Sequence, residues 1–413
     1  MSDLLFLAHR LPFPPNKGDK VRSYHLLKYL AERHRVFLGT FIDDPRDEVY
    51  ADTVRKLCAE VYVVRLQPRL ARLHSLVGLA SGEALTLPYY CDAGMHAWVE
   101  RTVRERGIDT AVVFSSAMAQ YVTGIDDLRL LVDFVDVDSA KWSQYADQHF
   151  WPLSWLYRRE ATRLLAYETA VAERAAASFF VTEAELALFR RLAPQLRAQI
   201  VVWSNGVDAE HFSPEAVARL PPPPYPPGEL ALVFTGAMDY WPNIDAVVWF
   251  ASEILPALRQ RHPAVRFYIV GMNPAASVLA LAGEHVVVTG TVTDVRPYLH
   301  HAAVVVAPLR VARGVQNKVL EAMALARPLV VAQVCAIGID AVAGRDFDVA
   351  GDAGAYVDRI DALLRQPRRA AALGRAAREL VLERYCWKAN LQRLDPYLLV
   401  PTAVAPNRIK HDV

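Results

Sequence analysis

The stretch 313-RGVQNKVLEAMALARPLVVA-332 decides the fold class, because it joins a loop, a helix and a strand in direct succession. A loop that contains Gly314 leads into a helix expected over residues 317–326, and Pro328 then opens an apolar run typical of a buried strand. Lys318 stands in the first turn of that helix, where the helix dipole disfavours a cation. The placement predicts an anionic partner for the lysine, and a phosphate bound at the helix N-terminus would supply one.

The same alternation of apolar strands and helices runs along the whole chain. Strands are expected over residues 4–9, 35–41, 61–66, 110–115, 130–136, 178–182, 200–204, 231–236, 265–271, 286–290, 303–309 and 328–332. Helices are expected over residues 20–33, 152–176, 243–260 and 317–326. Apolar strands that alternate with helices predict parallel sheets covered on both faces. The predicted fold is α/β, with two Rossmann-like, doubly wound domains facing a central cleft.

The domain boundary is predicted by the proline-rich segment 221-PPPPYPPGEL-230, which cannot form a helix or a central strand. The turn signal in 204-SNGVD-208 precedes it and is interpreted as a hinge. The expected organisation is an N-terminal domain over residues 1–208, a linker over 209–230, a C-terminal domain over 231–385, and a C-terminal helix or tail over 386–413 that returns to the N-terminal domain.

Composition excludes several classes of protein. The 413 residues carry a net charge of +1, which argues against a dedicated nucleic-acid binder. The four cysteines are far apart without a CxxC pair, so they indicate reduced core residues. The first apolar run is too short for a secretory signal, and no stretch approaches the ~20 apolar residues of a membrane span. A cytoplasmic enzyme is expected.

Lys318 and Glu321 have two interpretations. In the first, the amides of the loop before the helix and the Lys318 ammonium bind a phosphate, while Glu321 accepts hydrogen bonds from a pair of sugar hydroxyls. In the second, the two side chains form an ordinary surface pair three residues apart on a helix, worth a few tenths of a kcal/mol. The sequence alone leaves both open.

A second candidate loop follows the first strand, within 10-RLPFPPNKGDKVRSYHLL-27. Glycine there allows close backbone approach, and the basic side chains lie next to a helix start, which suits a phosphate or an acceptor. The residues assigned to this acceptor or phosphate loop are Lys17, Gly18, Asp19, Lys20 and Arg22. An ordinary loop shaped by prolines, with solvated charges, is the alternative. The chain has no GxGxxG motif and no P-loop.

Asp136 and Asp138 form a DxD pattern after the strand expected at 130–136. Two carboxylates can hold Mg²⁺ or Mn²⁺ together with a phosphate, but such sites need more oxygen ligands than this motif supplies. The pattern recurs at Asp346 and Asp348, so it arises readily by chance. Asp138 is therefore expected to line the cleft, and no metal ligand is assigned.

The segment 65-RLQPRLARLHSLVGLA-80 mixes three arginines with four leucines in the pattern of a basic amphipathic helix. Such a helix can lie on an anionic membrane surface. Packing of its leucines against its own domain is the alternative.

Together, several motifs resemble one family. The motifs 204-SNGVDAEHF-212, 234-FTGAMDYWPNIDAVVWF-250, 270-VGMNP-274, 289-TGTVTDVRPYL-299 and 314-GVQNKVLEAMA-324 occur in that order. The set resembles the family-4 retaining glycosyltransferases of GT-B fold, and within them the sugar transferases associated with exosortase/PEP-CTERM exopolysaccharide loci. PNKGDKVRSYHLL and LVDFVDVDSAKWSQYA extend the resemblance into the first half.

The resemblance implies a nucleotide-sugar donor bound by the second domain and an acceptor bound by the first. Glu321 matches the second glutamate of the family's E-x7-E element, which holds the ribose hydroxyls, whereas Arg313 stands where the first is expected. Ala237 follows Gly236 where the family has a phosphate-binding arginine, so Lys318 is expected to take over the diphosphate. The implied donor-binding residues are Gly236, Gly271, Thr291, Val292, Arg313, Gly314, Val315, Gln316, Asn317, Lys318 and Glu321; Glu321, Lys318 and Asp138 are the catalytic candidates.

The implied reaction is transfer of a glycosyl group with retention, without a cofactor or an obligatory metal, in synthesis of an exopolysaccharide or related surface glycan. A saccharide or lipid-linked saccharide is the expected acceptor, at the cytoplasmic face of the inner membrane. Two rivals remain: a nucleotide-sugar epimerase of GT-B type, and a non-catalytic subunit that binds sugar nucleotides.

Overall fold

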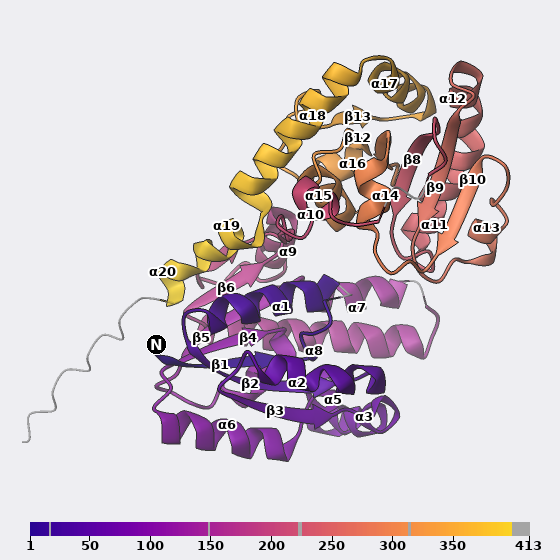
Figure 1. The fold of residues 1–413 in the computed structure, drawn as a ribbon. Helices are drawn as coiled ribbons and strands as arrows, with labels where there is room; N and C mark the ends of the chain where they lie inside the picture. Colours follow the sequence, from indigo (N-terminus) through magenta and orange to yellow (C-terminus); the bar gives the residue numbers. More distant parts are fainter. Residues whose placement is uncertain (16–17, 148, 222–224, 313–314, 399–413) are drawn as a thin grey trace, which may run out of the picture. The chain divides into compact units, whose positions relative to one another are not determined.

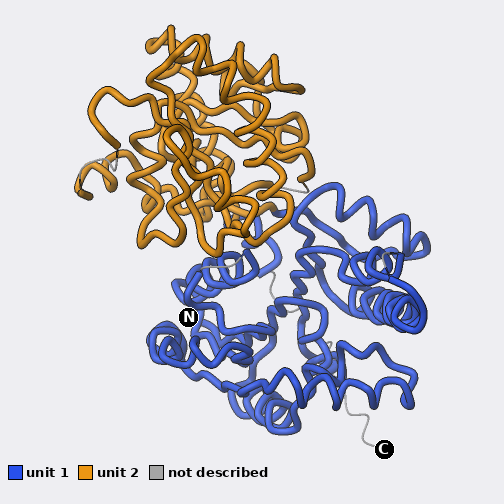
Figure 2. The backbone as a smooth tube through the Cα atoms, turned by 90° about the vertical axis from the view of Figure 1, so that its right-hand side faces the viewer, with its two compact units in different colours: residues 1–203, 391–413 blue, residues 204–390 orange. Residues whose placement is uncertain are grey.

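The chain forms two compact units. The computed structural model describes residues 1–15, 18–147, 149–221, 225–312 and 315–398. The first unit comprises residues 1–203 and 391–413, and the second comprises residues 204–390 (Figure 2). Each unit is a parallel sheet with helices on both faces, which is the α/β architecture expected from the alternation of apolar runs (Figure 1). The predicted fold class is confirmed.

Unit 1 contains a seven-stranded parallel sheet in the order β3-β2-β1-β4-β5-β6-β7. Its strands are β1 (Asp3–Ala8), β2 (Arg35–Ile42), β3 (Glu60–Arg65), β4 (Thr110–Phe114), β5 (Arg129–Val135), β6 (Ala177–Phe180) and β7 (Ile200–Val202). The strand order reverses between β1 and β4, which are hydrogen-bonded neighbours. Ligands of such sheets bind at the carboxyl ends of the strands where the order reverses.

The helices of unit 1 connect these strands and cover the sheet (Figure 1). They are α1 (Gly18–Ala31), η1 (Pro45–Tyr50), α2 (Ala51–Arg55), α3 (Pro68–Ser75), α4 (Val77–Ser81), α5 (Thr86–Tyr89), α6 (Ala93–Arg106), η2 (Ser116–Tyr121), α7 (Asp138–Asp147), α8 (Leu153–Arg174) and α9 (Glu183–Leu192). Their apolar faces and the strands bury a common core, so that most side chains of β1, β4 and β5 have little contact with water.

Unit 2 contains a six-stranded parallel sheet in the order β10-β9-β8-β11-β12-β13. Its strands are β8 (Leu230–Thr235), β9 (Val265–Val270), β10 (Val286–Gly290), β11 (Val304–Ala307), β12 (Leu329–Ala332) and β13 (Asp348–Ala350). The order reverses between β8 and β11, so the loops that follow these two strands lie at the position where ligands of doubly wound sheets bind.

The helices of unit 2 are α10 (Pro214–Val217), α11 (Trp241–Trp249), η3 (Phe250–Ile254), α12 (Leu255–Arg261), α13 (Ala276–Leu279), α14 (Arg296–His301), α15 (Asn317–Ala324), α16 (Gln333–Ala336), α17 (Ala353–Arg365), α18 (Pro367–Leu380), η4 (Val381–Tyr385) and α19 (Trp387–Leu391). The helix expected over residues 243–260 is interrupted by the π-turn η3. Pro256 follows it and lacks the N–H that a regular α-helix needs, which explains the local widening. α10 lies within the expected linker, of which residues 222–224 fall outside the described residues.

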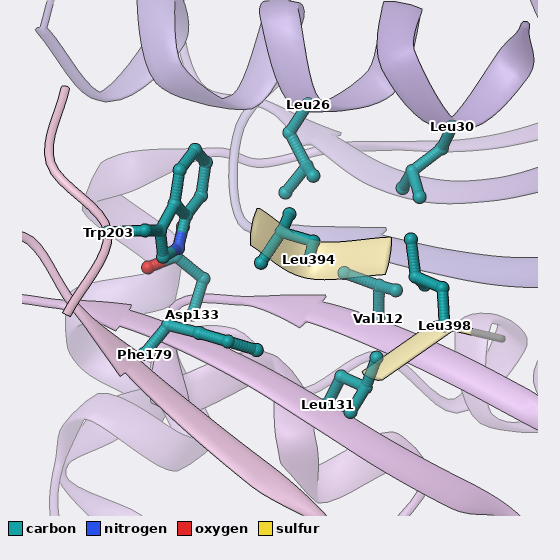
Figure 3. A pocket seen from close by; sticks show the side chains of 9 residues that line it. All are labelled: Leu26, Leu30, Val112, Leu131, Asp133, Phe179, Trp203, Leu394 and Leu398. Carbon is teal, nitrogen blue, oxygen red and sulfur yellow. The ribbon is translucent and has the colours of Figure 1, made fainter. Parts of the chain in front are cut away.

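The last described residues, up to Leu398, belong to unit 1. Residues Gln392–Leu394 and Asp395–Leu398 form the short helices η5 and α20. Tyr29 Oη donates a hydrogen bond to Asp395, and the rings of Phe179 and Tyr397 stack edge to face. Leu394 and Leu398 close a small apolar pocket whose other walls come from α1, the sheet and Trp203 (Figure 3).

Among the described residues, no helix combines the length and the apolar composition that a bilayer crossing requires.

Candidate functional site

Two glycines bring the ends of β8 and β9 together in unit 2. Gly236 follows β8, and a Cβ placed there would lie 2.7 Å from Asn243 Nδ2 and 3.0 Å from Lys318 Nζ. Gly271 follows β9, and a Cβ there would lie 1.6 Å from the carbonyl oxygen of Gly236. Any side chain at either position would displace backbone or polar groups. The two glycines, predicted as donor-binding residues, therefore form the floor of the site.

The side chain of Lys318 extends from the first turn of α15 to Asn243 in the first turn of α11. Its Nζ donates a hydrogen bond to Asn243 Oδ1 at 2.6 Å, and Asn243 Nδ2 donates to the carbonyl of Ala237 at 2.9 Å. The ammonium also lies 4.1 Å from the centre of the Phe234 ring. Among the described residues, no carboxylate lies within ion-pair distance of it. The structure thus holds a cation at the N-terminal ends of two helices, next to the loop that follows β8.

The surface pair proposed as the alternative interpretation of Lys318 and Glu321 does not form, because Nζ turns to Asn243. Glu321 lies one turn further along α15, and its carboxylate has no hydrogen bond to any described residue. Asn317 Oδ1 is also buried without a partner in the described part of the chain. Buried polar atoms are usually hydrogen-bonded, so Asn317 Oδ1, with the half-buried Glu321 carboxylate one turn away, identifies a place where a ligand can supply donors.

Burial shifts the pKa of both ionisable groups. It lowers the pKa of Lys318 to about 7, although the neighbouring Glu321 carboxylate partly opposes this. It raises the pKa of Glu321 to about 7, and the Lys318 ammonium opposes that shift. A diphosphate beside Lys318 would favour the charged ammonium, so anion binding and protonation of Lys318 are coupled.

The remaining predicted donor residues lie at the same edge of the sheet or outside the described residues. Thr291 and Val292 follow β10, and Val292 is half-buried against the core of unit 2. Val315 and Gln316 lead into α15, and Gln316 is its N-cap residue. Arg313 and Gly314 fall outside the described residues, so their predicted roles remain predictions.

The basic residues of the predicted acceptor loop face inward. Lys20 is 1% exposed and pairs with Asp47. Arg22 is buried and its guanidinium makes two hydrogen bonds to Asp133, at 2.7 and 3.1 Å. These carboxylates neutralise both cations within unit 1, so neither is available to a phosphate and both are structural.

The rest of that loop gives a mixed outcome. Gly18 begins α1, and a Cβ there would meet nothing within 4 Å, so close backbone approach is not what the structure requires of it. Lys17 falls outside the described residues. Asp19 accepts a hydrogen bond from Arg10 at 2.8 Å. Burial alone would raise the pKa of Asp19, but contacts with His9 and Arg10 hold it below its usual range.

Sequence reasoning missed His9 and Arg10, which follow β1 where the strand order of unit 1 reverses. The His9 ring stacks on Phe114, the last residue of β4, with 5.8 Å between ring centres. His9 Nε2 lies 3.6 Å from Asp19, while its Nδ1 is buried without a hydrogen-bond partner in the described chain. Arg10 also pairs with Asp43, which follows β2. The dipeptide His-Arg directly after the first strand was the available signal.

Backbone strain gathers at the same edge of unit 1. Ser115 follows β4 with φ of 77°, and Val135 ends β5 with φ of 67°. A branched residue such as valine rarely adopts this conformation, and such residues cluster at functional sites. We therefore regard His9, Arg10, Asp19 and Asp43 as a second group of candidate ligand-binding residues, in unit 1.

Asp138 begins α7 and shares Lys141 with Asp136, each carboxylate at 2.9 Å from Nζ. Burial alone would lower the pKa of Lys141, but the two carboxylates outweigh it and raise that pKa. The DxD pattern thus engages a lysine. Asp138 stays a candidate by its position after β5, at the carboxyl edge of the sheet.

Comparison with known proteins gives one family-model match, which lies within the second unit. Residues 229–366 match the family model described as glycosyl transferases group 1. This range spans β8 to α17 and therefore contains Gly236, Gly271, Lys318 and Glu321. No curated protein matches the chain.

Solved structures with the same fold cover nearly the whole chain. Anabaena Alr3699/HepE in complex with UDP has a TM-score of 0.65 at 16% identity, over 96% of this chain and 99% of its own. Sucrose-phosphate synthase from Thermosynechococcus elongatus has a TM-score of 0.67 at 18% identity, over 96% and 98%. WaaG, a glycosyltransferase involved in lipopolysaccharide biosynthesis, has a TM-score of 0.59 at 16% identity, over 95% and 99%.

At these identities the structural likeness shows the fold alone, and the family match is confined to residues 229–366 of unit 2. The two observations agree with the parallel sheets, their reversal points and the glycine-floored site after β8. The chain therefore has the two-domain GT-B fold, and residues 229–366 of its second unit match the family model described as glycosyl transferases group 1.

Proposed function

We propose that the protein is a retaining glycosyltransferase that moves a sugar from a nucleoside-diphosphate sugar to a saccharide or lipid-linked saccharide. The observation that carries the proposal is the Lys318 ammonium, held by Asn243 over Gly236 at the reversal point of the unit 2 sheet. Helix N-termini, a cation and a side-chain-free floor are what a diphosphate requires.

The donor is proposed to bind through this group of residues. The family resemblance expects a phosphate-binding arginine directly after Gly236 and a lysine a few residues later, but Ala237 and Asn243 stand in that stretch. Lys318 reaches Asn243 from α15 and places its ammonium there. It therefore supplies a positive charge in the stretch that lacks the family's arginine and lysine. Glu321 and the unpartnered Asn317 oxygen are then proposed to accept hydrogen bonds from the ribose and sugar hydroxyls.

The proposed chemistry needs only modest help from the protein. The bond between the anomeric carbon and the donor phosphate oxygen breaks, and a bond from the acceptor oxygen to the same face of that carbon forms. The proton of the acceptor hydroxyl passes to the departing phosphate oxygen, so no protein nucleophile and no cofactor is required. Lys318 stabilises the negative charge that develops on the diphosphate, an effect that is strong in a partly dehydrated site. A metal is not obligatory on this proposal.

The acceptor is proposed to bind to unit 1 through His9, Arg10, Asp19 and Asp43. A carboxylate, an imidazole and a guanidinium in contact offer both donors and acceptors, which suits saccharide hydroxyls. The resemblance to exosortase-associated sugar transferases of family 4 supports a role in exopolysaccharide or surface-glycan synthesis. A lipid-linked acceptor would place the enzyme at the cytoplasmic face of the inner membrane.

The experiment that tests this function uses UDP-glucose, since UDP and UDP-glucose are the ligands in the solved Anabaena complexes. A true donor raises the melting temperature of the protein with increasing concentration, because it binds the folded state. Labelled sugar should be transferred to an acceptor or, slowly, released by hydrolysis of the donor. In both cases the product should first form with the anomeric configuration of the donor. Conversion to an epimer without any acceptor would instead support the epimerase alternative. Binding without release of sugar to any acceptor or to water would support the non-catalytic subunit.

Glu321→Gln is expected to weaken binding of UDP about tenfold, because an amide replaces a carboxylate that accepts hydrogen bonds from ribose. Isothermal titration with UDP and with its 2′,3′-dideoxy analogue measures this contact. The native protein should prefer UDP, and the variant should lose that preference. Glu253→Gln, at an exposed position in η3, is the matched control. If Glu321→Gln kept the native preference for UDP, Glu321 would not be the residue that binds the ribose hydroxyls.

UDP-glucose binding is expected to weaken by up to about 50-fold between pH 7 and pH 9, since the pKa of Lys318 is lowered to about 7. In this window the free lysine loses its proton, and the diphosphate binds the charged form. Binding therefore takes up a proton, and the loss of affinity follows the rise in pH. Titration calorimetry in buffers of different ionisation enthalpy measures the uptake. Lys318→Met should bind weakly with no such dependence; the same slope in that variant would assign the proton to another group.

A further inference from the structure

The helices α3 and α4 turn their large apolar side chains toward solvent. Leu70, Leu73 and Val77 form one stripe at helical spacing and are 59%, 65% and 54% exposed. The small residues Ala71 and Ser75 form the buried face instead. The sequence alternative, in which the leucines pack against their own domain, is therefore wrong. An amphipathic helix that buries its small residues and exposes its leucines has a face without a partner in unit 1.

A second apolar group lies at the connection between α7 and α8. Phe150 is 94% exposed and Trp151 is 80% exposed, both just before α8 begins. Trp155 in the first turn of α8 is 55% exposed, and Tyr145 near the end of α7 is 47% exposed. Single exposed apolar residues are normal on a protein surface, but a group of large aromatic residues at such exposure marks an interaction site.

Hydrogen bonds join the two groups into one region of unit 1. Arg159, one turn after Trp155, donates to the carbonyl of Gly78 in α4 at 2.6 Å and to that of Glu83 at 3.0 Å. The next residue, Glu160, is buried and accepts a hydrogen bond from the Thr86 amide at 2.9 Å. The start of α8 is therefore fixed to the end of α4. In Figure 1 the connection from α7 to α8 lies at the same end of unit 1 as α3 and α5. We call these residues together the aromatic–leucine face.

The charge of the aromatic–leucine face is basic. Between residues 66 and 82 the charged side chains are Arg69 and Arg72, and no aspartate or glutamate occurs there. Both arginines are exposed and flank the leucine stripe of α3. Near the aromatic group, Asp147 is matched by Arg158 at 3.9 Å. The face therefore combines leucines, tryptophans and a phenylalanine with the exposed guanidinium groups of Arg69 and Arg72.

We propose that the aromatic–leucine face docks unit 1 on the surface of an anionic lipid bilayer. Tryptophan, phenylalanine and leucine partition into the boundary between headgroups and acyl chains, and arginine binds anionic headgroups at the same depth. A protein partner with a matching groove would explain the leucines but not the combination with exposed arginines and tryptophans. The proposal identifies the membrane partner for the function proposed above, and relies on that function only for the acceptor being lipid-linked.

The experiment is cosedimentation of the full chain with vesicles of phosphatidylcholine, with and without about one third phosphatidylglycerol. The native protein should bind the anionic vesicles, bind the neutral ones weakly, and dissociate as salt is raised. Phe150→Ser with Trp151→Ser, and separately Leu70→Ser with Leu73→Ser, should each lower the vesicle affinity about tenfold, since each pair removes buried apolar area at the interface. Arg69→Gln with Arg72→Gln should remove the preference for anionic vesicles.

Val49→Ser and Ile337→Ser are the controls, because these side chains are 75% and 80% exposed but lie outside the aromatic–leucine face. They should bind vesicles as the native protein does. Equal binding by the Phe150/Trp151 and Leu70/Leu73 variants would overturn the proposal, as would a native protein that stays in the supernatant. A native dimer by light scattering that these changes convert to a monomer would assign the face to self-association instead. Binding of UDP-glucose, measured on the same samples, tests the proposed function separately.

Discussion

Lys318→Ala is expected to weaken binding of UDP-glucose by about 30-fold to 100-fold at pH 7. The estimate follows from the loss of one charge-assisted hydrogen bond to phosphate, worth about 2–3 kcal/mol. In this chain the loss should be near the upper end, since Ala237 and Asn243 offer no second cation beside Gly236. Isothermal titration calorimetry measures the affinity directly.

The control for this prediction is Lys388→Ala, which removes an exposed lysine from the same unit. It should bind the donor as the native protein does. Lys318→Ala should also keep or raise the melting temperature without ligand, because burial of an ammonium costs free energy that the alanine does not incur. Unchanged affinity in Lys318→Ala would contradict the donor site, whereas lost affinity together with a lower melting temperature would indicate a general structural defect.

Arg22→Met is expected to destabilise unit 1 by about 3–5 kcal/mol, since it leaves the Asp133 carboxylate buried without its partner. The guanidinium also donates to the carbonyl of Trp203 at 3.0 Å and lies 3.6 Å from the centre of that ring. Hydrogen exchange of amides in β1 and β5 under mild denaturant measures the free energy of opening of unit 1.

Removing the second charge should restore much of the stability. Arg22→Met with Asp133→Leu replaces the buried pair by apolar side chains, and such replacements are often neutral. Arg35→Met is the comparison, because Arg35 is exposed and its ion pair with Asp3 should contribute less than about 1 kcal/mol. Donor affinity should survive in the double variant. If Arg22→Met were stable but no longer bound the nucleotide, Arg22 would be a phosphate-binding residue and not a structural one.

Much of the fold was within reach of the sequence, because apolar runs and helical spacing are local properties. The runs at 4–9, 231–236 and 303–309 become β1, β8 and β11 with small changes at their ends. Several helices were not expected, among them α6, α17 and α18. Their apolar positions are diluted by alanine and arginine, so the periodic signal is weak until the helix is seen against its sheet.

The candidate site was only partly predictable, because its decisive contacts join distant residues. Lys318 and Asn243 are 75 positions apart, and Arg22 and Asp133 are 111 apart. A basic side chain next to a helix start has the same local sequence whether it awaits a phosphate or neutralises a buried aspartate. Arg22 neutralises the buried Asp133, whereas Lys318 is proposed to bind a phosphate. The leucines of α3 present the same difficulty, since periodicity identifies a helical face but not the direction in which it points.

The two-part composition of unit 1 has a consequence for how the protein is made. A ribosome releases residues 1–203 well before residues 391–398, which cover the apolar pocket beside Trp203, Leu26 and Leu131. During that interval unit 2 is synthesised, while the apolar side chains of unit 1 that line this pocket stay exposed to water. Only when the last helical turns emerge can Leu394 and Leu398 complete the first unit. A chain that lacks residues 391–398 would therefore leave this apolar part of unit 1 exposed to water.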